Sequence, residues 1–235
     1  MVARLTHDVV YFVKESSSNE ELVYSLRSLE KNWPYKSVWF CGGCPTALEP
    51  DHHLKIRQIG LNKWEKVRYS IKLVCLNNKI SEDFWLFNDD FFILKPFRNP
   101  RPQYNGTLSD YIESIKMKHA GSHSQYTLRL LAAIKALEEG GYTTLNYEVH
   151  KPMLVNRKKA LEVLDRFPEY GSFRSLYGNY WKIGGVDCPD MKINDTVGIG
   201  DKNWGFLSTS DNSFRNGEVG AYIRNQFKER SRFEI

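Results

Sequence analysis

Short runs of β-branched and aromatic residues recur in the first hundred positions and predict the strands of a sheet. The runs lie at 8–13, 37–41 and 84–88, with a weaker candidate at 54–59. They are apolar with little alternation, which is typical of strands buried on both faces of a sheet. After three polar residues, Asn88-Asp89-Asp90, the apolar segment "FFILK" continues the third run.

Apolar residues at helical spacing separate these runs. A stripe over 22–29 predicts an amphipathic helix that begins near Ser18, with Glu21 at the spacing of a capping box. A second stripe over 64–74 predicts another helix, which ends near Asn77. The order is strand, helix, strand, strand, helix, strand. This alternation predicts an α/β fold with a mainly parallel sheet flanked by helices.

The second half of the chain has a different pattern of residues. Helical patterns are predicted at 108–118, 124–139, 157–167 and 217–229, and a strand is predicted at 147–155. Residues 168–215 are rich in Gly, Asn, Asp and aromatic residues, which predicts loops and short strands around a site. We expect one domain over 1–235, with an α/β half (1–98) and a helical, loop-rich half (99–235).

Composition agrees with one domain and narrows the class of protein. The 235 residues are 41% hydrophobic, which is enough for one sizeable core. The net charge of +5 suits an anionic ligand such as a nucleotide sugar, or loose contact with nucleic acid or a membrane. No apolar run reaches the roughly 18–20 residues that span a bilayer. With no secretory pattern and four cysteines, we expect a cytoplasmic protein.

The polar residues that interrupt the apolar run are the first sign of function. Two neighbouring carboxylates repel each other and are costly to bury. Asp89 and Asp90 follow a predicted strand, and ligands of α/β sheets bind at the carboxyl ends of strands. Carboxylate oxygens bind Mg²⁺ and Mn²⁺, which also bind phosphates and would remove the repulsion. The pair therefore predicts a metal and diphosphate site, although Asn and Asp also form plain turns.

Several segments, in order along the chain, resemble one protein family. They are "DVVYFV", "NEELVYSLRSLEKNWPYKSVWFCGG", "ISEDFWLFNDDFFILKP", "HKPMLVNRKKALEVLDRFPE", "SFRSLYGNY", "FLSTSDNSF" and "RSRFEI". These segments resemble regions of the Stealth family, sugar-1-phosphate transferases of capsule synthesis whose core is similar to the GT-A glycosyltransferase fold. The resemblance implies a GT-A-like fold, a nucleotide-sugar donor such as a UDP-sugar, and Mg²⁺ or Mn²⁺ as cofactor. The half over 1–98 would bind the donor, and 99–235 would form the acceptor side.

The resemblance also implies roles for individual residues. Asp89 and Asp90 would bind the metal, Asp90 would act in catalysis, and Asn88 beside them would contact the donor. His150 would be the base, because an imidazole accepts a proton from a hydroxyl near neutral pH; as a cation it would instead bind phosphate. Arg174 would clamp the pyrophosphate, because a guanidinium matches phosphate oxygens in two-point contact. A structural histidine and a solvated arginine are the alternatives.

Four further residues are candidates at the margin of this pattern. By resemblance, Asp211 would act with Asn212 near the transferred group. Lys14 ends the first predicted strand, where a nucleotide would bind. Arg27 lies on the first predicted helix, from which it would reach donor phosphates or pair with an acid of its own helix.

The chemistry of transfer is left open by the residues. The resemblance implies transfer of a sugar-1-phosphate to a glycan or polymer hydroxyl. However, the first strand runs into Lys14-Glu15-Ser16 rather than the family's Trp-Val-Asp-Gly segment. The same machinery would also transfer the sugar itself to a polysaccharide, a cell-wall polymer or a hydroxylated DNA base. A non-catalytic module that binds sugar nucleotides is the third alternative.

Overall fold

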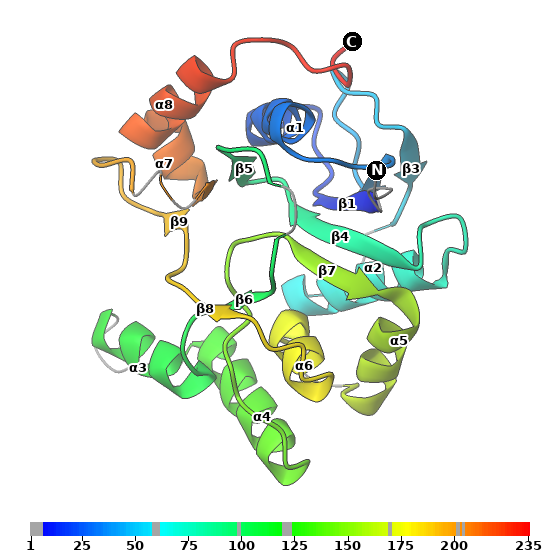
Figure 1. Ribbon diagram of the computed structural model, residues 1–235, viewed down its shortest axis with the longest axis vertical. Helices are drawn as coiled ribbons and strands as arrows, with labels where there is room; N and C mark the ends of the chain where they lie inside the picture. The colour runs from blue at the N-terminus through cyan, green and yellow to red at the C-terminus, as the bar shows by residue number, and fades with distance from the viewer. Residues whose placement is uncertain are drawn as a thin grey trace, which may run out of the picture.

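A five-stranded sheet forms the centre of the computed structural model, which describes residues 7–57, 62–97, 100–118, 124–168, 171–200, 203 and 205–235. Its strands are β1 (Asp8–Val13), β2 (Val38–Gly42), β3 (His52–Leu54), β4 (Asp83–Asn88) and β7 (Met153–Asn156). They lie in the order β3-β2-β1-β4-β7; the first four are parallel, and β7 is antiparallel to β4 (Figure 1). The predicted α/β fold with a mainly parallel sheet is therefore confirmed.

Helices cover both faces of this sheet, which explains the uninterrupted apolar strands. Helix α1 (Glu20–Asn32) packs its leucines against one face, where Tyr11, Phe40 and Phe87 are fully buried. Helices α2 (Lys63–Leu76) and α5 (Arg157–Arg166) cover the other face, against Val10 and Leu86 (Figure 1). Because successive strand residues point to opposite faces, the residues of β1 that point to either face must be apolar.

Two predicted boundaries differ from the structure near the N-terminus. The predicted capping box with Ser18 is wrong: Asn19 caps α1, and its side chain accepts a hydrogen bond from the backbone N–H of Leu22. The weaker strand was predicted at 54–59, but β3 ends at Leu54, and positions 58 and 59 lie outside the described residues. Ile56 supplies the apolar signal there by filling the core without pairing in the sheet.

The chain leaves the central sheet directly after the acidic pair. The prediction that the apolar segment after Asp90 continues the strand of β4 is wrong. Strand β5 (Phe91–Ile93) instead pairs antiparallel with β10 (Phe206–Thr209), which also pairs with β9 (Lys192–Ile193). Helices α7 (Asp211–Asn216) and α8 (Glu218–Gln226) pack against this second sheet through Phe92, Leu207 and Phe214. The turn at Asp89-Asp90 thus joins two sheets.

The remaining helices lie beyond the edge of the sheet at β7. Helices α3 (Leu108–Lys118) and α4 (Gln125–Glu139) form as predicted, and β6 (Gln103–Tyr104) pairs with β8 (Val186–Asp187) (Figure 1). Helix α6 (Phe173–Tyr180) lies in the segment predicted as loops and strands. None of the described helices combines the length and the apolar character needed to cross a bilayer.

Candidate active site

A cleft of about 770 Å³ opens at the carboxyl ends of β1 and β4. The strand order reverses between these two strands, because the chain runs from β1 outward to β3 and then returns to β4 on the other side. Open α/β sheets bind ligands at such a switch point. Phe12, Asn88 and Asp89 line the cleft from the strand ends. Helix α2 and the start of α6 supply other parts of its wall.

The two aspartates that follow β4 diverge. Asp89 lines the cleft, and its Oδ2 accepts a hydrogen bond of 2.7 Å from the side-chain amide of Asn19. Burial, followed by the negative charge of Asp90, raises the pKa of Asp89 above its ordinary value. The predicted repulsion between the two carboxylates is therefore present, and a cation in the cleft would relieve it.

Asp90 points toward the second sheet. Its Oδ2 accepts hydrogen bonds from Lys192 Nζ at 2.8 Å and from the Ser208 hydroxyl at 2.9 Å. Its Oδ1 is buried and has no hydrogen-bond partner among the described residues. Lys192 also lines the cleft, so part of the charge of Asp90 is already balanced by an ammonium group.

His150 lines the same cleft and is held by Asp190. Its Nδ1 lies 2.8 Å from Asp190 Oδ2, and its backbone N–H donates to Asp190 Oδ1 at 3.0 Å. Burial alone would raise the pKa of Asp190, but the hydrogen bond and charge of His150 hold it below its ordinary value. An ionised Asp190 keeps the proton on Nδ1 and leaves Nε2 free to accept one.

Arg174 is buried behind Asn88 in the wall of the cleft. Its Nη1 donates to the backbone carbonyl of Lys151 at 2.7 Å, and its Nη2 lies 3.4 Å from Asn88 Oδ1. Burial lowers the pKa of Arg174, and the nearby charge of Glu148 opposes that shift. The predicted phosphate clamp is thus in the cleft, with two of its donors engaged by the protein.

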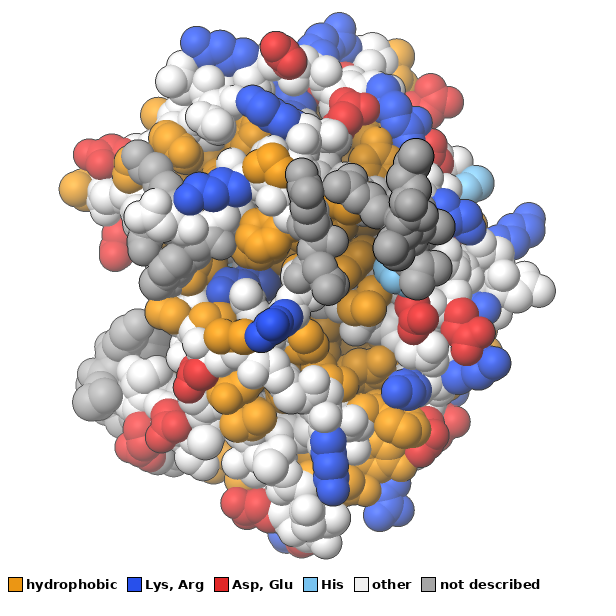
Figure 2. Space-filling view, viewed as in Figure 1, with side chains coloured by type: hydrophobic (Ala, Val, Ile, Leu, Met, Phe, Trp, Pro, Cys, Tyr) orange, Lys and Arg blue, Asp and Glu red, His pale blue; other side chains and the backbone are white. Residues whose placement is uncertain are grey.

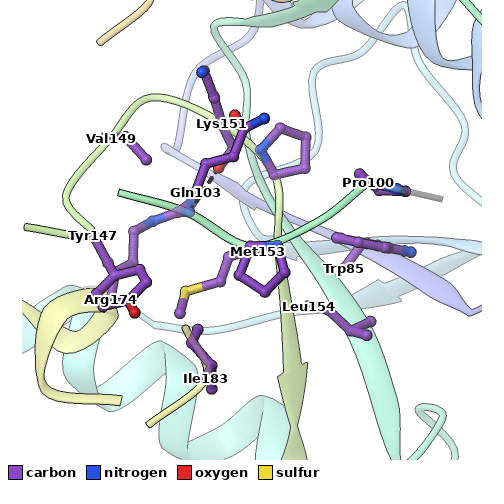
Figure 3. A pocket seen from close by; sticks show the side chains of 12 residues that line it. Trp85, Pro100, Gln103, Tyr147, Val149, Lys151, Met153, Leu154, Arg174 and Ile183 are labelled. Atoms are coloured by element: carbon purple, nitrogen blue, oxygen red, sulfur yellow. Dashed lines mark hydrogen bonds between the residues drawn. The ribbon is translucent and has the colours of Figure 1, made fainter. Parts of the chain in front are cut away.

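A smaller cavity of about 70 Å³ lies on the far side of Arg174. It is lined mainly by apolar side chains, among them Trp85, Met153 and Leu154, and Lys151 and Arg174 complete its wall (Figure 3). Arg174 therefore contributes to the walls of both cavities.

Five predicted site residues lie outside the residues that line the cleft, and Asp90 is one of them. Lys14 is exposed after β1. Arg27 donates to Glu234 from both Nε and Nη2 and so ties α1 to the C-terminal segment. Asp211 and Asn212 are exposed at the start of α7, although the charge of Asp211 contributes to raising the pKa of Glu21. Their predicted roles stay predictions.

Several residues that sequence reasoning missed lie in the second half of the chain. Asp190 lies in a segment with Asp187, Asp195 and Asp201 whose spacing does not fit an EF-hand loop, and which reads equally as a polar donor or acceptor loop or as ordinary surface; Asp201 lies outside the described residues. Lys192 and Glu148 carried no signal. Helix α6 had one: Phe173, Leu176, Tyr177 and Tyr180 recur at i, i+3, i+4 and i+7.

The donor set is compatible with a hard divalent cation. Within the part of the chain that the structure describes, no group of three or more His, Cys, Asp or Glu side chains would hold a metal by itself. The orphaned Oδ1 of Asp90 and the carboxylate of Asp89 are nevertheless oxygen ligands of the kind that Mg²⁺ and Mn²⁺ prefer. Such ions are commonly bound through one or two carboxylates together with substrate phosphates, and the residues fit that mode.

No known protein-family profile matches the chain, and no curated protein matches it. Among solved structures, apo-form glycosyltransferase GlyE of Streptococcus pneumoniae TIGR4 is similar with a TM-score of 0.44 and 10% identity. That match covers 95% of this chain, which spans 60% of the length of GlyE. Apo mouse xyloside xylosyltransferase 1 matches with a TM-score of 0.38 and 8% identity, over 98% of this chain and 96% of the mouse chain. Similarities of this strength do not establish the reaction or substrate, and the resemblance to Stealth proteins stays a prediction.

Proposed function

We propose that the chain is a nucleotide-sugar-dependent transferase whose reaction takes place in the cleft at the ends of β1 and β4. One observation carries the proposal: His150, oriented by Asp190 at 2.8 Å, lines the same cleft as Asp89 at the switch point of the sheet. A base and a carboxylate around one cleft match the needs of transfer from a diphosphate donor to a hydroxyl.

His150 acts as the general base in this proposal. With Nδ1–H donating to Asp190, Nε2 accepts the proton of the acceptor hydroxyl as that oxygen attacks the donor. The carboxylate of Asp190 stabilises the imidazolium that forms and holds the ring in one orientation. Positioned bases of this kind contribute roughly 10²–10⁴ in rate.

The donor diphosphate lies at the strand ends. Asp89 and Asp90 would hold Mg²⁺ or Mn²⁺, which supplies charge stabilisation for the departing nucleotide. Lys192, 2.8 Å from Asp90, and the guanidinium of Arg174 add positive charge from the protein. These groups oppose the negative charge that builds on the leaving group.

Aromatic rings also line the cleft, and we place the acceptor against them. Tyr111 and Tyr126 pack edge to face with ring centroids 6.3 Å apart, and Trp64 and Phe173 also line the cleft. Sugar rings stack on such apolar faces, which favours a glycan hydroxyl as acceptor. A DNA acceptor has less support, because Lys and Arg side chains are scattered over the face shown in Figure 2 rather than gathered in a stripe.

The released nucleotide tests the proposal and separates its two chemistries. The full chain is incubated with a panel of nucleotide sugars, Mn²⁺ and glycan acceptors, and the nucleotide product is identified. Release of UMP from a UDP-sugar means sugar-1-phosphate transfer, as the Stealth resemblance implies, whereas release of UDP means glycosyl transfer. Asp89→Ala should abolish either product. Binding of donors with no product under any of these conditions would instead support a non-catalytic binding module.

A further inference from the structure

The N-terminus of α6 forms part of the cleft wall, through Ser172, Phe173 and Arg174. Ser172 occupies the N-cap position in the left-handed region (φ 60°, ψ 45°), which side-chain-bearing residues rarely adopt. A serine at an N-cap ordinarily accepts a hydrogen bond from the first turn of its helix. Ser172 makes no such bond, so its hydroxyl is not used to cap α6.

The Ser172 hydroxyl is also without any other partner. The residue is only 8% exposed, and its Oγ is buried with no hydrogen bond among the described residues. A buried hydroxyl that leaves water and gains no partner is costly, and such atoms in native proteins usually have a reason. Because Ser172 lines the cleft, a ligand in the cleft is the natural partner for this donor.

The first turn of α6 offers further donors beside this hydroxyl. The first N–H groups of a helix have no partner within the helix and carry partial positive charge. The N–H of Ser175 donates to Glu148 Oε1 at 3.0 Å. The N–H groups of Phe173 and Arg174 have no such acceptor in the described part of the chain. Two backbone donors and one hydroxyl therefore remain available at the same wall.

Arg174 adds a positive charge to this wall, on which the carboxylates of Glu148, Asp90 and Asp190 act from beyond ion-pair distance. Among the described residues, no Asp or Glu oxygen lies within ion-pair distance of its guanidinium, whose Nη atoms contact Lys151 and Asn88. The guanidinium of Arg174 also lies over the ring of Phe91, with its Cζ 5.6 Å from the ring centroid. A buried guanidinium without an ion-pair contact, beside N–H groups without an acceptor, attracts an anion.

We propose that Ser172, the first turn of α6 and Arg174 form a phosphate-binding subsite of the cleft. Resting on the proposed transferase function, the subsite takes a phosphate of the donor diphosphate or a phosphate carried by the acceptor. The Ser172 hydroxyl and the N–H groups of Phe173 and Arg174 donate to phosphate oxygens. Glu148 stays on the N–H of Ser175.

Calorimetric titration of the full chain with inorganic phosphate, in EDTA so that no metal contributes, tests the subsite. Ser172→Gly removes the hydroxyl and accepts the left-handed backbone without strain. We expect it to weaken phosphate binding about tenfold or more, while its melting temperature stays equal or rises because a buried unpaired hydroxyl is lost. Wild-type phosphate affinity in Ser172→Gly, or no binding of phosphate to the unaltered chain, would overturn the proposal.

Ser124→Gly is the matched control. Ser124 caps α4, its hydroxyl accepts a hydrogen bond from the N–H of Thr127, and it does not line the cleft. This variant should lose stability and keep its phosphate affinity, the opposite of Ser172→Gly. Titrations with UDP and with glucose 6-phosphate identify the source, because only the ligand whose phosphate uses the subsite loses affinity in Ser172→Gly. Failure to release nucleotide would sink the transferase function and leave these binding results standing.

Discussion

The side-chain amide of Asn19 donates a hydrogen bond of 2.7 Å to Oδ2 of Asp89. The same side chain accepts from the N–H of Leu22 and caps α1. One residue therefore ties the start of the first helix to the carboxylate at the end of β4. Since α1 packs against β1, β2 and β4 on one face of the sheet, this contact fixes Asp89 against a rigid element, as a precise ligand site requires.

Two substitutions separate the roles of Asn19 in capping α1 and in donating to Asp89. Ser is as good an N-cap as Asn but lacks the amide donor, so Asn19→Ser should stay within about 0.5 kcal/mol of the unaltered chain in urea unfolding. Asn19→Ala loses cap and donor and should cost about 1 kcal/mol or more. We expect both variants to lose about tenfold in nucleotide release, because Asp89 is no longer held. Full activity in Asn19→Ser would show that Asp89 needs no such support.

The base is tested at His150 and at its partner. His150→Gln should lower kcat roughly 10²–10⁴-fold, with little change in unfolding temperature, because the side chain is partly exposed in the cleft. Asp190→Asn should also lower kcat, since an amide N–H directed at Nδ1 would fix the wrong tautomer. Nucleotide release measured at saturating donor checks both.

His53 supplies the control for these variants. Its Nε2 lies 2.8 Å from the backbone carbonyl of Gly42, and it is exposed on β3 away from the cleft lining. His53→Gln should therefore keep kcat near that of the unaltered chain. A loss in His53→Gln equal to that in His150→Gln would mean that the effect arises from the fold rather than from proton transfer.

The sequence predicted the half of the site that follows local rules. An apolar strand followed by Asn88-Asp89-Asp90 placed a carboxylate at the sheet edge, and Asp89 is there. The strand pattern could not show that Asp90 turns toward β10, because that direction depends on Lys192, 102 positions later in the chain. Side-chain pairing between distant segments leaves no period in the sequence.

The same limit explains the missed parts of the second half. Asp190 lies 40 positions from His150, in a loop without spacing that marks it. Helix α6 spans only eight residues, and short helices are stabilised by packing rather than by intrinsic propensity. The sequence also did not show that Asn19, rather than Ser18, caps α1 and bonds Asp89, 70 positions away.

Metal binding is expected to depend on Asp89. In the presence of UDP, Asp89→Asn should weaken Mn²⁺ binding about tenfold or more, because an amide oxygen is a poorer ligand than a carboxylate. Electron paramagnetic resonance of free Mn²⁺ measures this without any need for turnover. Asp83→Asn is the control, since Asp83 begins the same strand at its opposite end and accepts a hydrogen bond from Asn156. Equal Mn²⁺ affinity in both variants would remove the acidic pair from the proposed metal site.

Glu21 gives the chain a stability that depends on pH. Burial raises its pKa from 4.5 to about 7, the charges of Asp90, Asp211 and Asp89 add to the shift, and a hydrogen bond from Thr209 opposes it. Between these two values the folded chain binds a proton that the unfolded chain has released. The free energy of unfolding contributed by Glu21 therefore falls as pH rises through this window.

Glu21→Gln replaces the titrating carboxyl with a neutral amide. Its free energy of unfolding, relative to that of the unaltered chain, should rise by about 1 kcal/mol between about pH 5 and about pH 8, after allowance for partial exposure. Urea unfolding in EDTA at both pH values measures the difference. Glu20→Gln is the control, because the hydrogen bond from Arg224 lowers the pKa of Glu20, so that its ionised form is the stabilising one. This variant should lose stability by nearly the same amount at both pH values, because the pKa of Glu20 lies below 4.5 and its carboxylate is ionised throughout this range. A Glu21→Gln difference that is the same at both pH values would show that the Glu21 carboxyl is not held protonated by its neighbours.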